Sequence, residues 1–473
     1  MKAAKEIVLI TINAKWIHPS LALRLLKANL GPLEDNCRII EFNLRQPLNE
    51  MKNALLAESP RILGISVSVW NHIAALELLR ELENAWIARP VIVLGGPEVS
   101  HLRPEGEIFR YADHVIRGEG ENAFRLLCEN IMGGGRTLNF PDAYHYADLP
   151  EIKTAYHLYT DEDVRKKLIY AESGRGCPYN CEFCLSSFDS NVREFPLEKF
   201  LEEMDILIQR GVKTFKFLDR SFNINVKRSL RIMEFFLERI NGRPSSSAPF
   251  VVHFEMVPSL FPDELRVMLA RFPPGSLRLE IGIQTLNPEV SARIGRVSNP
   301  EKEIETLRFL YGNTSAVIHA DLIAGLPGED LDSFGRGFDM LWSAFEDQCQ
   351  ITKQGVHISD RVEIQTGILK LLPGTPILRR SEYYRMRCGG LPPYEVTETS
   401  AMSGEDLSRV KNFSRFWELI VNRKLVSGAK LAELGGKNGV FKAFIGISDR
   451  LFSRFGRSWG IDKKELILEL REI

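Results

Sequence analysis

The chain has 473 residues, about three times the length of an ordinary domain, so several domains are expected. Apolar residues make up 44% and charged residues 26%, a balance that is typical of folded proteins and excludes wholesale disorder. Lys and Arg number 61 against 62 Asp and Glu, so the formal net charge is -1 and a nucleic-acid partner is disfavoured.

Neither a secretory signal nor a membrane span is visible. The apolar run at the N-terminus is too short for a signal, and no stretch approaches the roughly 20 apolar residues that cross a bilayer. Three of the seven cysteines lie close together, while Cys37, Cys128, Cys349 and Cys388 are scattered. This is no disulfide framework, and it indicates metal chemistry in a reducing compartment. We therefore expect a cytoplasmic protein without a membrane partner.

Residues 1–135 alternate short apolar, β-branched runs with segments of helical periodicity. Five strands that alternate with five helices predict an α/β domain with a doubly wound parallel sheet. Right-handed crossovers would cover both of its faces with helices. The expected strands are 6–12, 37–43, 62–68, 90–96 and 113–120, and the expected helices are 20–30, 48–59, 71–86, 105–112 and 121–132.

Three glycines then interrupt the pattern, and we interpret residues 136–166 as a linker between domains. A second alternation within 167–376 contains six strand-helix units. Six units are too few to close a complete barrel, so we expect an open, partial (β/α)6 barrel with its active face at the carboxyl ends of the strands. Residues 377–473 turn helical and more polar, which predicts a C-terminal helical region.

Small and polar residues follow three expected strands of the first sheet. A doubly wound sheet binds ligands at the carboxyl ends of its strands, and paired glycines let the backbone approach a phosphate-bearing tail. The nicotinamide fingerprint G-x-G-x-x-G is absent from the first turn. The candidate binding residues are Asn13, His18, Ser66, Ser68, Trp70, Gly95, Gly96, Pro97 and Glu98. Trp70 and the nearby His72 also have the simpler interpretation that they pack in the fold.

The clustered cysteines form a C-x3-C-x2-C motif of Cys177, Cys181 and Cys184, directly after the first expected barrel strand. Three soft thiolates on one compact loop suit an iron-sulfur cluster and leave one of four irons open. An open iron can chelate the amino and carboxylate groups of S-adenosylmethionine. Zinc is the alternative, but a closed zinc site needs a fourth ligand, and the sequence offers none nearby.

This loop closely resembles the signature of radical S-adenosylmethionine enzymes. The resemblance continues through motifs at 217–223, 253–256, 280–296, 321–329 and 371–376, which look like the strand ends of the subgroup fused to cobalamin domains. It implies that Phe183 packs near the adenine. It also makes Glu255, Gln284 and Arg296 candidates for contacting S-adenosylmethionine, with Asp219 and Asp321 as further candidates. Each of these residues has the alternative of an ordinary ion pair or cap.

The N-terminal region, over roughly residues 5–130, resembles the cobalamin-binding domains that precede such barrels, through LGGPEVS at 94–100 and RGEGE at 117–121. This resemblance adds Gly118 and Glu119 to the candidates. The D-x-H-x-x-G motif that supplies a histidine to cobalt in many cobalamin enzymes is missing. We therefore expect cobalt without a lower histidine ligand, with His18 contacting the corrin side groups, capping the first helix or serving a structural role.

Taken together, the resemblance implies an enzyme with a 4Fe-4S cluster, S-adenosylmethionine and cobalamin as cofactors. Such an enzyme would cleave S-adenosylmethionine reductively to a 5'-deoxyadenosyl radical and methylate, or rearrange, an unactivated carbon. An external electron donor of flavodoxin or ferredoxin type is implied, and the substrate stays open.

Two alternatives remain. A methylthiotransferase acting on RNA or protein has a similar barrel, but such enzymes carry a second cluster on three N-terminal cysteines, and only Cys37 and Cys128 precede the loop here. A cobalamin or redox sensor without catalysis is the other alternative. In the C-terminal region, Tyr383 and Tyr384 either line the open side of the barrel or pack against its body.

Overall fold

The computed structural model of the chain describes residues 5–135, 144–244, 249–351, 361–425 and 439–471. The chain divides into two compact units, Met1–Gly174 with Arg193–Lys216, and Arg175–Val192 with Phe217–Ile473. Within the described ranges, no helix is long and apolar enough to cross a membrane.

The first sheet has five parallel strands in the order β2-β1-β3-β4-β5. The predicted doubly wound sheet is therefore confirmed, with the switch in strand order between β1 and β3. Its strands are β1 (Ile7–Asn13), β2 (Cys37–Asn43), β3 (Ile62–Ser66), β4 (Val91–Gly95) and β5 (His114–Val115).

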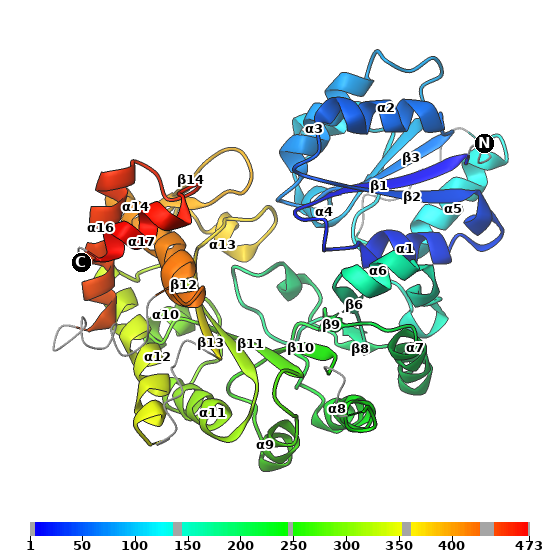
Figure 1. Cartoon of the computed structure of the whole chain (residues 1–473). Coiled ribbons are helices and arrows are strands. Elements are labelled where there is room, and N and C mark those ends of the chain that lie inside the picture. Colours follow the sequence, from blue (N-terminus) through cyan, green and yellow to red (C-terminus); the bar gives the residue numbers. More distant parts are fainter. Residues whose placement is uncertain (1–4, 136–143, 245–248, 352–360, 426–438, 472–473) are drawn as a thin grey trace. The chain divides into compact units, whose positions relative to one another are not determined.

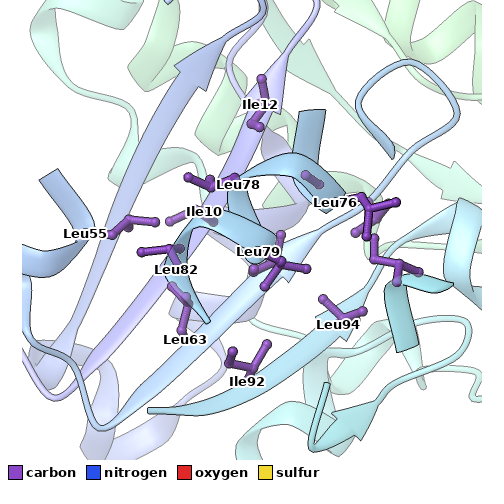
Figure 2. Close-up of a cluster of buried hydrophobic side chains, with 14 of the residues drawn as sticks. Ile10, Ile12, Leu55, Leu63, Leu76, Leu78, Leu79, Leu82, Ile92 and Leu94 are labelled. Carbon is purple, nitrogen blue, oxygen red and sulfur yellow. The ribbon is translucent and has the colours of Figure 1, made fainter. Parts of the chain in front are cut away.

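Helices cover both faces of this sheet (Figure 1). The first face packs against α2 (Leu48–Glu58) and α3 (His72–Leu82), and the second against α1 (Leu21–Ala28) and α5 (Glu121–Met132). Figure 2 shows the apolar core of the first face, where Ile10 and Leu63 of the strands meet Leu55 and Leu79 of the helices. The helix expected at 105–112 is only a short 3₁₀ helix (Glu107–Tyr111), preceded by α4 (Pro97–His101).

The described part of the expected linker, 144–166, packs within the first unit. It contains 3₁₀ helices at Leu149–Glu151 and Tyr156–Leu158, and then α6 (Asp161–Lys166), which a capping box at Thr160 begins. The buried Arg24 of α1 holds Asp163 at 2.9 Å between Nη2 and Oδ2. This segment is anchored by contacts distant in sequence, which its lack of periodicity concealed. The first compact unit continues to Gly174 and includes Arg193–Lys216.

The second sheet has six strands in the order β13-β12-β11-β10-β9-β6, which confirms the predicted partial barrel. These strands are β6 (Ile169–Ala171), β9 (Thr214–Phe217), β10 (Val251–Met256), β11 (Leu277–Gln284), β12 (Val317–Ala324) and β13 (Val362–Ile368). The helices that alternate with them are α7 (Leu197–Gln209), α8 (Val226–Asn241), α9 (Asp263–Ala270), α10 (Pro288–Arg293), α11 (Pro300–Asn313) and α12 (Leu331–Ile351). The short strands β7 (Gly174–Arg175) and β8 (Arg193–Glu194) lie outside this sheet.

Alternate residues of the barrel strands have opposite characters. Phe254 of β10 and Ile281 of β11 are fully buried, whereas His253 and Glu280 lie on the other face with 3.3 Å between Nε2 and Oε2. A parallel sheet covered on both faces would be apolar on both. The polar second face is therefore the face available for chemistry.

The C-terminal region contains α13 (Pro376–Arg379), α14 (Gly404–Trp417), a π-helical turn (Glu418–Asn422), α16 (Val440–Phe455) and α17 (Lys463–Arg471). Aromatic side chains join it to the barrel, because Phe338 of α12 lies edge-on to Trp417 with 4.8 Å between ring centroids. An antiparallel pair, β14 (Arg387–Cys388) with β15 (Val396–Glu398), interrupts the predicted helical region.

Candidate functional site

The three clustered cysteines lie on a loop that follows β7 at the carboxyl edge of the barrel. The loop is closed by its own backbone. The N–H of Cys177 donates to the carbonyl oxygen of Asp189 at 2.8 Å, and the N–H of Cys184 donates to that of Cys181 at 3.0 Å. These bonds hold the three side chains on one short segment before any metal binds.

Gly176 sets the start of this loop. Its φ is +95°, and a Cβ at this position would lie 2.2 Å from the carbonyl oxygen of Asn191. Both the backbone conformation and the space therefore exclude a side chain. The sequence analysis did not single out Gly176, although a glycine directly before the first cysteine was a usable signal.

The Cys181 thiol is buried beside a cation. Burial raises the pKa of the Cys181 thiol, the guanidinium of Arg296 opposes this, and the neighbouring thiols of Cys184 and Cys177 raise it further. The Sγ of Cys177 lies 3.1 Å from the Oγ of Ser221. Cys181 thus lies close to the other two thiols and to one cation, and that cation partly offsets the effect of burial on Cys181.

The donor set fits the iron-sulfur cluster that the motif implies, because each thiolate supplies one soft ligand. The Nε–H of Arg296 is buried and has no hydrogen-bond acceptor within the described residues. A buried donor without such an acceptor therefore lies next to the thiols. Over the same residues, no three His, Cys, Asp or Glu side chains converge on a position for a single metal ion.

β11 ends next to this loop in an irregular turn. Its register with β12 shifts between Gly282 and Gln284, and Gln284 has a left-handed φ of 69°. The Nε2 of Gln284 lies 2.6 Å from where a Cβ on Gly282 would stand. Arg296 donates to the carbonyl oxygen of Gly282. The turn at Gly282 therefore holds Arg296 beside Cys181, and the strained Gln284 lies in the same turn.

The other barrel candidates follow the strands at the same edge. Glu255 of β10 pairs with Arg220, with 3.6 Å between Oε2 and Nη1. Asp219 follows the end of β9 and is half-buried, as is Phe183 in the cysteine loop. Arg220, which follows Asp219 directly in the chain, thus pairs with Glu255. The roles of these residues toward S-adenosylmethionine stay predictions.

Two buried carboxyl groups near this edge escaped the sequence analysis. Burial raises the pKa of Glu303 to about 7, opposed by the guanidinium of Arg296. Burial likewise raises the pKa of Glu329 to about 7, and the Oγ1 of Thr285 donates to its Oε1 at 2.6 Å. No sequence signal separates such residues from the many surface glutamates.

Glu329 makes folding stability dependent on pH. Its folded pKa of about 7 lies above the ordinary value of 4.5, so the folded state binds more protons between these values. The stability that Glu329 contributes is therefore fully present below pH 4.5 and is lost as the pH rises toward 7. The loss amounts to ~3 kcal/mol for this group. We expect Glu329→Gln to reduce this fall in urea denaturation of the cofactor-free protein at pH 5 and pH 8. The exposed Glu289→Gln serves as the control, and equal pH slopes for wild type and Glu329→Gln would refute the assignment.

At the carboxyl edge of the first sheet, Asn71 joins two strand ends by hydrogen bonds, a role that the sequence analysis did not predict. Asn71 is fully buried, and its Nδ2 donates to the carbonyl oxygens of Ile12 at 3.1 Å and Ser66 at 3.2 Å. Its Oδ1 accepts from the N–H of Ser68 at 2.7 Å. Asn71 thus holds the ends of β1 and β3 at the switch point. The Nδ2 of Asn13, at the end of β1, donates to Glu41.

A close backbone approach occurs where β4 ends at Gly95. Gly96 has a φ of +103°, and a Cβ there would lie 2.5 Å from the carbonyl oxygen of Val67. Pro97 then begins α4. Exposed apolar side chains follow the strands at this edge, namely Trp16, Ile17, Leu44, Trp70 and Ile73. Bare backbone beside exposed apolar side chains fits a large cofactor with a polar tail.

Both histidines of this edge have partners. The Nδ1 of His18 lies 2.8 Å from the hydroxyl of Tyr170, and burial lowers the pKa of His18. The prediction that His18 caps the first helix is wrong, because the side chain of Ser20 accepts the capping hydrogen bond. The Nδ1 of the buried His72 lies 2.9 Å from the Oε1 of Glu98, so His72 packs as its simpler interpretation suggested.

Gly118 and Glu119 contact the segment that follows α5. The carboxylate of Glu119 pairs with Arg193, with 2.6 Å between Oε1 and Nη2, and accepts from the N–H of Ala147 at 2.7 Å. A Cβ on Gly118 would lie 2.4 Å from the carbonyl oxygen of His145. These contacts give a structural reason for a glycine at position 118 and a glutamate at position 119. The binding of cobalamin by Gly118 and Glu119 stays a prediction.

Two family models match the chain. The model described as B12 binding domain matches residues 7–128, which hold the first sheet, and the model described as Radical SAM superfamily matches residues 172–341, which hold the cysteine loop and β9 to β12. These matches imply cobalamin, a 4Fe-4S cluster and S-adenosylmethionine as cofactors.

Curated relatives carry methyltransferase names. An uncharacterized methyltransferase of Pyrococcus horikoshii is 28% identical over 244 residues, which are 46% of this chain and 50% of the relative. The cobalamin-dependent radical SAM methyltransferase TokK of Streptomyces tokunonensis is 25% identical over 328 residues, 63% of this chain and 47% of the relative. The chain thus spans about half the length of the curated relatives it matches.

The chain is also similar in sequence to a methylthiotransferase. The ribosomal protein uS12 methylthiotransferase RimO of Chlamydia pneumoniae is 24% identical over 271 residues, 55% of this chain and 54% of the relative.

Solved structures show the same fold. The cobalamin-dependent S-adenosylmethionine radical enzyme OxsB, with aqua-cobalamin bound, has a TM-score of 0.67 and 16% identity, covering 98% of this chain and 74% of its own. The radical S-adenosylmethionine methyltransferase TsrM of Kitasatospora setae, with cobalamin and a 4Fe-4S cluster bound, has a TM-score of 0.60 and 17% identity, covering 82% and 78%. At these identities the likeness concerns the fold.

Proposed function

This chain belongs to the radical S-adenosylmethionine enzymes that carry an N-terminal cobalamin-binding domain, and we propose that it cleaves S-adenosylmethionine reductively in order to methylate an unactivated carbon. The observation that carries the proposal is the gathering of three thiols on one loop beside the guanidinium of Arg296. When bound, the cluster supplies the electron that splits S-adenosylmethionine into methionine and a 5'-deoxyadenosyl radical, and the cobalamin supplies the methyl group. Rearrangement of the same carbon is the variant that the family also includes.

Cys177, Cys181 and Cys184 would hold the cluster. Arg296 favours the thiolate form of Cys181, and its guanidinium would donate to the carboxylate of S-adenosylmethionine. The amide of Gln284, fixed by the strained end of β11, would orient the amine or ribose. A rigid strand end is the kind of support that positions a reacting group well.

Further candidates complete this site. Phe183 would pack against the adenine, and Glu255 and Asp219 would add polar contacts. An external donor of flavodoxin or ferredoxin type would deliver the electron. The proposed domains are 1–135 for cobalamin, 136–166 as a linker, 167–376 for the barrel and 377–473 for the helical region.

The carboxyl edge of the first sheet would hold the cobalamin. Gly95 and Gly96 leave the backbone bare for the nucleotide tail, and the exposed Trp70 offers an apolar contact for the corrin. The absence of the D-x-H-x-x-G motif supports cobalt without a histidine ligand.

We expect the anaerobically reconstituted and reduced protein to convert S-adenosylmethionine into 5'-deoxyadenosine and methionine. Arg296→Gln should slow this conversion at least about tenfold at unchanged iron content, because a charged hydrogen bond to the carboxylate is lost. The exposed Arg278→Gln of β11 is the matched control. A wild-type protein that holds a full cluster and forms no 5'-deoxyadenosine would disprove the proposal.

Similarity to RimO makes a methylthiotransferase the second candidate. The cysteines that precede the loop do not support it. Cys37 and Cys128 lie in the apolar core of the first sheet, and burial raises the pKa of Cys37 to about 12 and that of Cys128 further. Thiols held in this protonated form are poor ligands for a second cluster. About four irons per chain would support the first candidate, and about eight would support the second.

A further inference from the structure

A pocket opens at the carboxyl edge of the barrel, apart from the residues assigned to the cofactors. Its volume is about 870 Å³, and it is lined by Arg293, Gly328, Arg380, Tyr383, Tyr384 and Ser400. Arg293 ends α10 after β11, Gly328 follows β12, and Arg380 follows α13 after β13. Since these strands are parallel, the lining residues belong to the same edge as the cysteine loop. The volume is of the size that small-molecule sites have.

The pocket adjoins the cysteine loop through Glu182, which lies between the second and third cysteines. The N–H of Glu182 donates to the carbonyl oxygen of Ile294 at 2.9 Å, and the N–H of Ile377 donates to that of Glu182 at 3.0 Å. The carboxylate of Glu182 also pairs with Arg380. A ligand in this pocket would therefore lie next to the loop that holds the three thiols.

Arg293 is positioned before any ligand arrives. Its Nη1 donates to the carbonyl oxygen of Pro327 at 2.7 Å. Gly328 has a φ of +78°, and a Cβ there would lie 1.8 Å from Nη1 of Arg293. Any side chain at position 328 would therefore displace the guanidinium of Arg293. A guanidinium has five N–H donors in a fixed fork, so the bond to Pro327 leaves others for a ligand.

The lining carries a positive charge beside aromatic surface. Two guanidinium groups line the pocket, those of Arg293 and Arg380, and no carboxylate is among the described lining residues. Arg380 pairs with Glu182 of the adjoining loop. Tyr383 is 82% exposed, and its ring lies 5.1 Å from that of Tyr384. The sequence analysis left open whether these tyrosines pack or line the barrel, and both line this pocket. Arginine pairs favour planar or phosphate anions, and exposed rings favour a flat or apolar body.

We infer that this pocket binds the substrate through an anionic group, a carboxylate or a phosphate ester, held by Arg293 and Arg380 with the substrate body against Tyr383. This inference rests on the proposed function for the statement that the ligand is the substrate. The binding itself requires neither reductant nor turnover.

The test measures binding by titration calorimetry on the full chain with its cluster and cobalamin, using phenyl phosphate, benzoate and the neutral benzyl alcohol as probes. We expect one or both anions to bind and benzyl alcohol not to bind. Arg293→Gln should weaken anion binding at least about tenfold, which is the scale of one charged hydrogen bond. Gly328→Ala should have a similar effect because its methyl group displaces the guanidinium. Tighter binding of phenyl phosphate or of benzoate identifies the anion.

The exposed Arg387→Gln, an arginine outside the pocket lining, is the matched control and should bind as the wild type does. Arg293→Lys keeps the charge without the fork and should fall between wild type and Arg293→Gln. Equal binding of benzyl alcohol, or unchanged anion binding in Arg293→Gln, would overturn the inference. Intact anion binding in a protein that forms no 5'-deoxyadenosine would instead disprove the proposed function alone.

Discussion

Cys181→Ala is expected to abolish both cluster assembly and the formation of 5'-deoxyadenosine. Cys181 is the most buried of the three clustered cysteines and interacts with the other two and with Arg296. Each iron of the cluster needs its own ligand, so two thiols would leave a second iron open to solvent. Iron and sulfide analysis should fall from about four irons per chain toward none, and product formation should fall by at least about a thousandfold.

Cys388→Ala is the matched control, because Cys388 is half-buried and free but lies on β14, away from the loop. Its iron content and product formation should equal those of the wild type. The ligand assignment would be refuted by a Cys181→Ala protein that holds four irons and forms 5'-deoxyadenosine.

Gly96→Ala is expected to remove cobalamin binding. A methyl group at this position would lie 2.5 Å from the carbonyl oxygen and 2.9 Å from the nitrogen of Val67, so β3 and β4 would have to separate where both end. Positive φ adds about 1–2 kcal/mol of strain for any residue but glycine. Retention of hydroxocobalamin after desalting should fall from about one equivalent by at least about tenfold.

Gly134→Ala controls for the backbone strain, since Gly134 has a φ of +91° and nothing within 4 Å of its Cβ position. That variant should keep its cobalamin, and so should His18→Ala, whose Co(II) resonance spectrum should lack nitrogen splitting as in the wild type. If Gly96→Ala retained a full equivalent of cobalamin, the cradle would lie elsewhere. A nitrogen splitting that disappears in His18→Ala would show a histidine ligand after all.

The strands could be predicted where local pattern was sufficient. β1 and β2 agree with their predicted ranges within a residue at each end, because short apolar runs are recognisable without knowledge of their neighbours. The short β5 and the 3₁₀ helix at Glu107–Tyr111 were overestimated in length. Their ends depend on neighbouring loops, which periodicity does not report.

Contacts between distant residues could not be predicted. Segment 144–166 has no clear period, yet the pair of Arg24 with Asp163 and the bond of Asn29 to Lys153 anchor it. The burial of Glu303 and Glu329 likewise results from packing, since a glutamate in sequence carries no sign of its surroundings.

The clustering of Cys177, Cys181 and Cys184 was determined by the sequence alone, because three side chains within eight residues must be near one another in any fold. Their electrostatic setting was decided by tertiary structure. Arg296 reaches Cys181 only because the turn at Gly282 accepts its guanidinium, and Arg293 faces the pocket only because Gly328 leaves room for it. These pairs join different strand ends of the barrel, and the sheet brings those ends together at one edge.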